Sequence, residues 1–153
     1  MVKGGAKFGH AWILLTSVFA LHVIDEAVFD FLPFYNSFVT NAKEKLSFFP
    51  FPNFTFALWL SGLIAVIIIL FVLSKFAYRI TGWIIKVSVI YGIIMFINGI
   101  LHFVASVYFS KPIGGVYSSP LLIIGSIYLL WHAVKELKRS KNDYKTSGQR
   151  TGY

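Results

Sequence analysis

Long apolar stretches separated by short polar segments dominate the pattern of hydrophobic and polar positions along this chain. Residues 54–74, 87–110 and 112–134 contain no Asp, Glu, Lys or Arg, and about 20 apolar residues are enough for a helix to cross the hydrocarbon core of a bilayer. A fourth stretch begins at Phe8 and becomes polar at Asp25, although we expect its helix to continue to about Phe31. The pattern therefore predicts four transmembrane helices, at about 9–31, 54–75, 84–109 and 114–135.

Composition supports a membrane-embedded chain rather than a soluble domain. Of the 153 residues, 57% are hydrophobic and only 13% are charged, and a soluble domain of this length has too little interior to bury so much apolar surface. An open sheet is excluded because its unpaired backbone groups have no hydrogen-bond partners in lipid. We expect an all-α, polytopic membrane protein: a four-helix transmembrane bundle at residues 1–140 and a basic tail at 141–153.

Lysine and arginine are distributed unequally between the two sides of the predicted bundle. Three, Lys43, Lys45 and Lys111, lie on one side, and the other eleven lie at the N-terminus, between the second and third spans, or in the tail. Because these residues favour the cytoplasmic side, we expect a multi-pass cell-membrane protein with both termini cytoplasmic. The net charge of +8 follows from this flanking pattern, so the expected partner is the lipid bilayer and not nucleic acid. The alternative for the first stretch is a secretory signal cleaved near Ala20.

The predicted outer loop at 31–53 is unusually rich in phenylalanine and proline. Residues 48–52 read Phe-Phe-Pro-Phe-Pro, which is incompatible with a regular helix, and aromatic residues favour the membrane interface. We therefore expect an irregular, aromatic and proline-rich loop. It would serve either as an interfacial anchor or as a lid and access route for an apolar substrate.

Two polar clusters interrupt the apolar helices and carry the functional signal. His22, Asp25 and Glu26 are spaced i, i+3 and i+4, and Asn98 and His102 are spaced i and i+4, so each cluster lies on one helix face. Both clusters belong to the outer half of a helix that runs outward. We therefore expect all five side chains to face inward at a similar depth and to form one site.

The chemistry of these five residues leaves three interpretations open. Burying two carboxylates in lipid costs a few kcal/mol or more each, and a divalent metal would offset that cost. In the metal interpretation, His22, Asp25, Glu26 and His102 bind zinc, or iron or manganese, and Asn98 is a further ligand or a donor to one. In the second, Glu26 or Asp25 and a histidine act as an acid–base pair without metal. In the third, a hydrogen-bonded network only ties the two helices together.

The two clusters resemble the signature of a known family. His22-Val23-Ile24-Asp25-Glu26 is similar to the H-x-x-E-E element of the HXXEE family of small multi-span membrane proteins, with Asp25 in place of the first Glu. Asn98-Gly99-Ile100-Leu101-His102 matches its N-x-x-x-H element, and Tyr108, Pro112 and Gly114 loosely follow its Y-x-P-G element. The resemblance implies that the five residues form one site, and it implies no substrate.

Two classes of function follow from these features. The first is a membrane-embedded, metal-dependent enzyme, a hydrolase or other lipid-modifying enzyme, in which Glu26 or Asp25 doubles as general base for an attacking water. The second is a non-catalytic subunit of a membrane complex, or a homo-oligomer, whose polar cluster supports packing. Ser118 and Ser119 are expected to serve turn chemistry after Gly114 and Gly115, and His132 is expected to be a packing residue near the inner surface.

Overall fold

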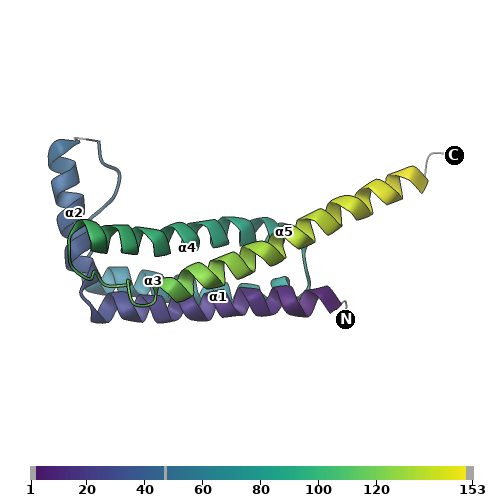
Figure 1. Cartoon of the computed structure of the whole chain (residues 1–153), viewed down its shortest axis with the longest axis horizontal. Helices are drawn as coiled ribbons and strands as arrows, with labels where there is room; N and C mark the ends of the chain where they lie inside the picture. The colour runs from purple at the N-terminus through teal and green to yellow at the C-terminus, as the bar shows by residue number, and fades with distance from the viewer. Residues whose placement is uncertain (1–2, 47, 151–153) are drawn as a thin grey trace.

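The computed structural model describes residues 3–46 and 48–150. In that part of the chain, the regular secondary structure is helical (Figure 1). The elements are α1 (Lys3–Val28), α2 (Phe31–Lys45), α3 (Phe56–Tyr78), α4 (Gly82–Tyr108) and α5 (Ser119–Arg150). Four segments are long and apolar enough to cross a membrane: Gly5–Val28, Phe56–Tyr78, Gly82–Tyr108 and Ser119–Asn142. The prediction of an all-α chain with four membrane-spanning helices is confirmed.

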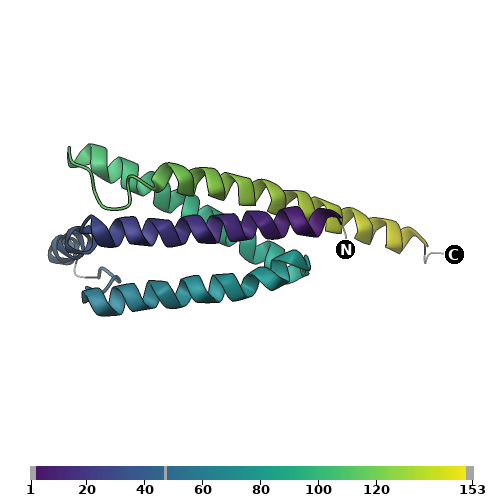
Figure 2. The same ribbon diagram turned by 90° about the horizontal axis from the view of Figure 1, so that it is seen from below.

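The four long helices run along one common direction, and α2 lies across one end of them (Figures 1 and 2). Both ends of the chain lie toward the opposite end. We call these the α2 end and the terminal end of the bundle. The arrangement follows from an even number of spans, each long enough to cross once.

Helix α1 is the centre of the bundle, and α3 is its most peripheral member. Half of the most apolar stretch of α1 is buried inside the protein, whereas only 6% of the corresponding stretch of α3 is buried. Helix α1 packs against α3 and α5, and α4 packs against α5, while α3 and α4 share little packing although a short turn joins them. The Trp12 indole donates a hydrogen bond of 2.8 Å to the Leu70 carbonyl of α3. An apolar helix with so little protein around it needs lipid to cover its surface.

The chain between α1 and α3 differs from the predicted irregular loop. Helix α1 ends at Val28 rather than near Phe31, and Asp30 adopts a left-handed backbone conformation with φ of 51° before α2 begins. Helix α2 then occupies most of the predicted loop. Pro33 is tolerated because it lies in the first turn of α2, where the backbone N–H has no intrahelical acceptor. Irregular structure is confined to the segment after α2, which contains Phe48–Pro52.

An asparagine on α2 holds this irregular segment against the helix. The Asn36 side chain accepts a hydrogen bond of 3.0 Å from the Phe54 amide and donates one of 2.8 Å to the Phe54 carbonyl. The Asn53 side chain in turn donates to the Asn36 carbonyl and to the Thr40 hydroxyl, at 3.2 and 3.1 Å. These bonds attach the start of α3 to α2, so the orientation of α2 is coupled to that of α3.

The boundaries of the last helix, α5, also differ from the predicted ones. Helix α5 begins at Ser119, later than the expected 114, because residues 109–118 form a loop in which Gly115 has φ of 93°. The helix then continues to Arg150, so the expected tail at 141–153 is helical as far as that residue. No proline lies between 121 and 150 to end the helix.

Candidate functional site

The site lies at the α2 end of the bundle, between α1 and α4. His22 and Glu26 of α1 are buried, as is His102 of α4, while Asn98 is half-buried. His22 and His102 each precede the last residue of their helix by six positions, which is about 9 Å along the helix axis. The structure thus brings the two clusters to the same depth, as their spacing predicted.

One carboxylate oxygen lies next to both imidazoles. Glu26 Oε1 is 3.1 Å from His102 Nε2 and 3.5 Å from His22 Nε2. The two rings are in edge-to-face contact, with centroids 4.8 Å apart and an interplanar angle of 86°. His22, Glu26 and His102 therefore form a compact buried group, which we call the His–Glu cluster.

The His–Glu cluster has the ligand types of a divalent-metal site. Each of its three residues offers one ligand atom, and these atoms all lie within 4.8 Å of one another. Nitrogen and oxygen ligands about 2.0–2.2 Å from a tetrahedral zinc are about 3.3–3.6 Å apart. The 3.5 Å separation agrees with this value, whereas the 3.1 Å separation is shorter and is the length of a direct hydrogen bond. His102 Nδ1 is buried and has no hydrogen-bond partner among the described residues. His22, Glu26 and His102 could therefore hold a metal ion.

Asp25 does not join this cluster, although the sequence predicted it as a ligand. Its Oδ2 accepts hydrogen bonds from the Ser118 amide at 2.8 Å and from the Ser118 hydroxyl at 2.6 Å. Helix geometry separates the two carboxylates: Glu26 is directed at the imidazoles, and Asp25 is directed at the start of α5. Within the described part of the chain, a role for Asp25 as a ligand has no geometric support.

Ser118 belongs to the site, and turn chemistry alone does not describe it. Besides bonding to Asp25, its Oγ lies 2.8 Å from His22 Nδ1. The contact spans 96 positions in the sequence and depends on how loop 109–118 folds back onto α1. The glycine pair at 114–115 followed by two serines was the only signal in the sequence, and such a pattern is common in turns.

Gly115 closes the other side of the cluster. A Cβ on Gly115 would lie 2.5 Å from His102 Cε1 and 2.9 Å from His22 Cε1, and the residue has a left-handed φ of 93°. Both facts require glycine here, since a side chain would strain the backbone and displace the rings. The loop therefore packs directly on the two imidazoles.

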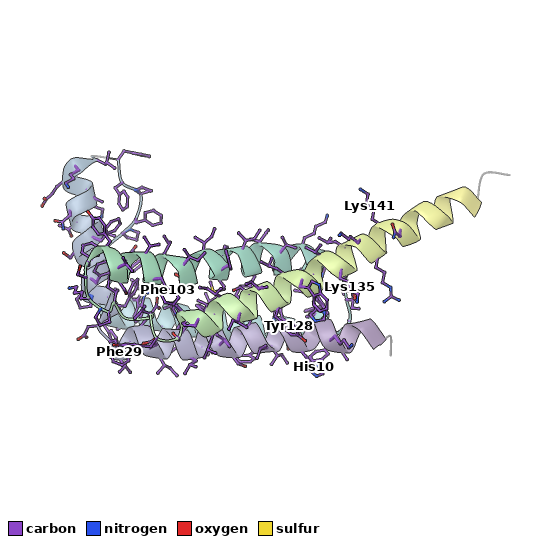
Figure 3. All side chains as sticks on the ribbon, in the orientation of Figure 1. His10, Phe29, Phe103, Tyr128, Lys135 and Lys141 are labelled. Atoms are coloured by element: carbon purple, nitrogen blue, oxygen red, sulfur yellow. The ribbon has the colours of Figure 1, made fainter. Side chains whose placement is uncertain are left out.

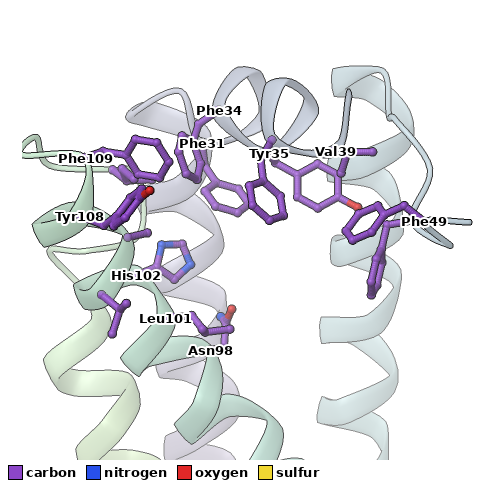
Figure 4. Close-up of a pocket in the computed structure, with 15 residues that line it drawn as sticks. Phe31, Phe34, Tyr35, Val39, Phe49, Asn98, Leu101, His102, Tyr108 and Phe109 are labelled. Carbon is purple, nitrogen blue, oxygen red and sulfur yellow. The ribbon is translucent and has the colours of Figure 1, made fainter. Parts of the chain in front are cut away.

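An apolar pocket of about 730 Å³ reaches the cluster from beneath α2 (Figure 4). Aromatic side chains of α2, including Phe31, Phe34 and Tyr35, form its wall on one side, and the last three turns of α4 form the other. His102 and Asn98 contribute polar atoms to this wall. Partial burial raises the pKa of the Tyr35 phenol above its ordinary value, so this hydroxyl stays protonated at neutral pH. The volume is within the range of small-molecule sites.

The remaining histidines lie away from the site. His10 and Tyr128 mark the part of the bundle toward the terminal end, with Lys135 and Lys141 beyond them, whereas Phe29 lies at the α2 end (Figure 3). His132 packs edge-on against the rings of Tyr128 and Trp131. This agrees with the packing role expected of His132.

The chain matches no protein-family model, no curated protein and no solved structure. The chemistry of the site is therefore inferred from its own residues.

Proposed function

We propose that this chain is an integral membrane enzyme that binds a divalent metal at His22, Glu26 and His102 and acts on a lipid or other apolar substrate. One observation carries the proposal: a single Glu26 oxygen lies 3.1 and 3.5 Å from two imidazole nitrogens, beside an apolar pocket that includes His102. Membership of the HXXEE family, with both termini cytoplasmic and the site in the outer leaflet, is part of the same proposal.

The ligand set favours a catalytic metal over a purely structural one. Two histidines and one glutamate fill three positions of a tetrahedral site and leave the fourth open, as in catalytic zinc sites. Iron or manganese would also accept these nitrogen and oxygen ligands. A bound metal would supply Lewis acidity and lower the pKa of a water in the open position. Its charge would also compensate the carboxylate of Glu26, which is otherwise costly to keep ionised inside a membrane.

The pocket supports an apolar substrate that arrives from the bilayer. Several residues of its wall are exposed on the side of the bundle, among them Leu101 and Val104 of α4 and Phe51, each more than half exposed. In a membrane these side chains contact lipid, so a hydrocarbon group could move from the bilayer into the pocket without crossing water. Asn98 and His102, which line the pocket, would meet the polar group of such a molecule.

Metal content of the purified protein tests the proposal. Wild type, His102→Ala and Glu26→Gln would be prepared in detergent without chelators and analysed by mass spectrometry for zinc, iron and manganese. His132→Ala is the matched control, because it removes another buried histidine outside the cluster. We expect near-stoichiometric metal in wild type and His132→Ala and a large loss in the two cluster variants. No metal in any correctly folded sample would refute a metal-dependent function.

A second candidate function is that of a non-catalytic membrane component, which forms either a homo-oligomer or a subunit of a larger membrane complex. One observation favours it: α1 and α4 both pack against α5 and share little direct packing. The contacts of His22 and Glu26 with Asn98 and His102, together with the Trp12–Tyr91 ring contact, join these two helices directly. In that case Glu26→Gln would lower the thermal stability of a wild type that contains no metal.

A further inference from the structure

We propose that Asp25 and Ser118 fix the tautomer of His22, holding its proton on Nδ1 and leaving the Nε2 lone pair for a metal. Ser118 is then a positioning residue: it touches a metal ligand, and neither the metal nor the substrate. The effect on metal affinity rests on the proposed function, whereas the tautomer of His22 does not.

The contacts form a continuous buried chain from α1 through the loop and back to α1. Asp25 Oδ2 lies 2.6 Å from Ser118 Oγ, which lies 2.8 Å from His22 Nδ1. His22 is fully buried, and Asp25 and Ser118 are 8% and 5% exposed. Side chains at these distances and in this environment keep a fixed arrangement, since water is not available to replace a lost partner.

The direction of each hydrogen bond follows from a count of protons. Ser118 Oγ donates its single proton to Asp25 Oδ2 at 2.6 Å, and the Gly115 carbonyl, 3.3 Å away, is a second acceptor beside the same hydroxyl. Ser118 Oγ then has only lone pairs left for His22. The 2.8 Å contact requires His22 Nδ1 to be the donor, and therefore to carry the proton.

The opposite edge of the His22 ring agrees with this assignment. Asn98 Nδ2 lies 3.1 Å from His22 Nε2, and an amide nitrogen is only a donor, so Nε2 must accept. The same Nε2 atom lies 3.5 Å from Glu26 Oε1. In the neutral imidazole the Nε2 lone pair is therefore on the side of the His–Glu cluster, and a metal bound there would replace the hydrogen bond from Asn98.

The start of α5 supplies a second hydrogen-bond donor to Asp25. The Ser118 carbonyl accepts a hydrogen bond of 3.0 Å from the Leu122 amide in the first turn of α5. The Ser118 amide donates a hydrogen bond of 2.8 Å to Asp25 Oδ2. Asp25 thus accepts from a free amide at the N-terminus of a helix, where the helix dipole favours negative charge. The Ser118 hydroxyl lies beside Asp25 Oδ2, the Gly115 carbonyl and His22 Nδ1.

The tautomer can be measured directly on the protein in detergent micelles with ¹⁵N-labelled histidine. The two tautomers differ in which imidazole nitrogen shows the chemical shift of a protonated site, and the His22 signals would be assigned by substituting the other three histidines in turn. We expect His22 to carry its proton on Nδ1 in wild type and in Ser126→Ala. Ser126 is the matched control, because its buried hydroxyl bonds within its own helix, to the Leu122 carbonyl, and not to the His–Glu cluster as far as the structure describes the chain. In Ser118→Ala we expect a mixture of tautomers.

Zinc affinity measures the consequence for the site. We expect Ser118→Ala to bind zinc about 10–100-fold more weakly than wild type, as is usual when the partner of a ligating histidine is lost. Ser118→Thr keeps the hydroxyl and should restore most of the affinity, whereas a purely steric role would make the larger residue worse than alanine.

The outcomes separate the two proposals. A wild-type His22 protonated on Nε2, or an unchanged tautomer in Ser118→Ala, overturns the positioning role whether or not metal binds. A wild type that has the Nδ1 proton but binds no zinc, iron or manganese supports the positioning role of Asp25 and Ser118 and refutes the proposed function. If Ser118→Ala does not fold, the tautomer of the wild type still decides.

Discussion

Single residues at the α2 end have roles that their spacing alone did not assign. The spacing of His22, Asp25 and Glu26 correctly predicted three buried side chains on one face of α1. It did not predict that Glu26 would meet the two imidazoles while Asp25 meets Ser118. Adjacent positions on a helix differ in direction by about 100°, and only the position of the α4–α5 loop decides which neighbour each carboxylate finds.

Glu26→Gln tests the carboxylate itself. The amide is nearly the same size, so the fold should persist, but a neutral ligand without the carboxylate charge should reduce metal binding at least tenfold. Metal titration of the purified variant, beside circular dichroism as a check on folding, measures this. Wild-type affinity in a folded Glu26→Gln would show that the metal, if present, binds elsewhere.

Gly115→Ala should destabilise the protein strongly. A left-handed backbone costs an L-residue about 1–2 kcal/mol, and the new methyl would also collide with both imidazoles. Gly62→Ala is the control, because a Cβ at that α3 position meets nothing within 4 Å and alanine favours a helix. Thermal unfolding in detergent should show a clear drop for position 115 and none for position 62. Equal behaviour of the two variants would mean that the loop does not pack on the rings.

At the scale of elements, hydropathy located the spans but not the helix between the first two. Residues 56–78 and 82–108 are helices within a few positions of their predicted ranges, because length and apolarity alone identify a membrane span. Helix α2 was missed because Phe48–Pro52 was read as typical of the whole segment. Its apolar positions 31, 32, 35, 38 and 39 follow helical spacing.

Asn36→Ala should loosen the attachment of α2 to the start of α3. The variant loses both hydrogen bonds to the Phe54 backbone, at about 1 kcal/mol each. Hydrogen–deuterium exchange of the peptide that contains Phe54 should therefore become faster. Asn41→Ala is the control, since Asn41 is exposed on the same helix. Unchanged exchange at Phe54 would indicate that the aromatic contacts of α2 hold this segment without Asn36.

At the scale of the whole molecule, the positions of lysine and arginine can be compared with the end of the bundle at which the two termini lie. Both termini lie toward one end of the bundle (Figures 1 and 2), as four spans require. Which side of a membrane that end faces is a prediction from the excess of lysine and arginine near it.

The chain contains no cysteine, so single-cysteine variants give an unambiguous test of this orientation. We expect cysteines at Lys43 and Lys111 to react with a membrane-impermeant maleimide on intact cells, and a cysteine at Lys138 to react only after permeabilisation. The reverse pattern would place the site in the inner leaflet and would contradict cytoplasmic termini.

The exposed wall of the pocket determines the concentration scale on which binding of a ligand would be expressed. A molecule that reaches His102 past Leu101 and Val104 of α4 is already dissolved in the bilayer, so its occupancy depends on its mole fraction among the lipids and not on its concentration in the buffer. Adding inert lipid at constant ligand would then empty the pocket, while diluting the whole suspension with buffer would not. Binding and kinetic constants for this site would therefore have to be expressed per lipid, as two-dimensional quantities.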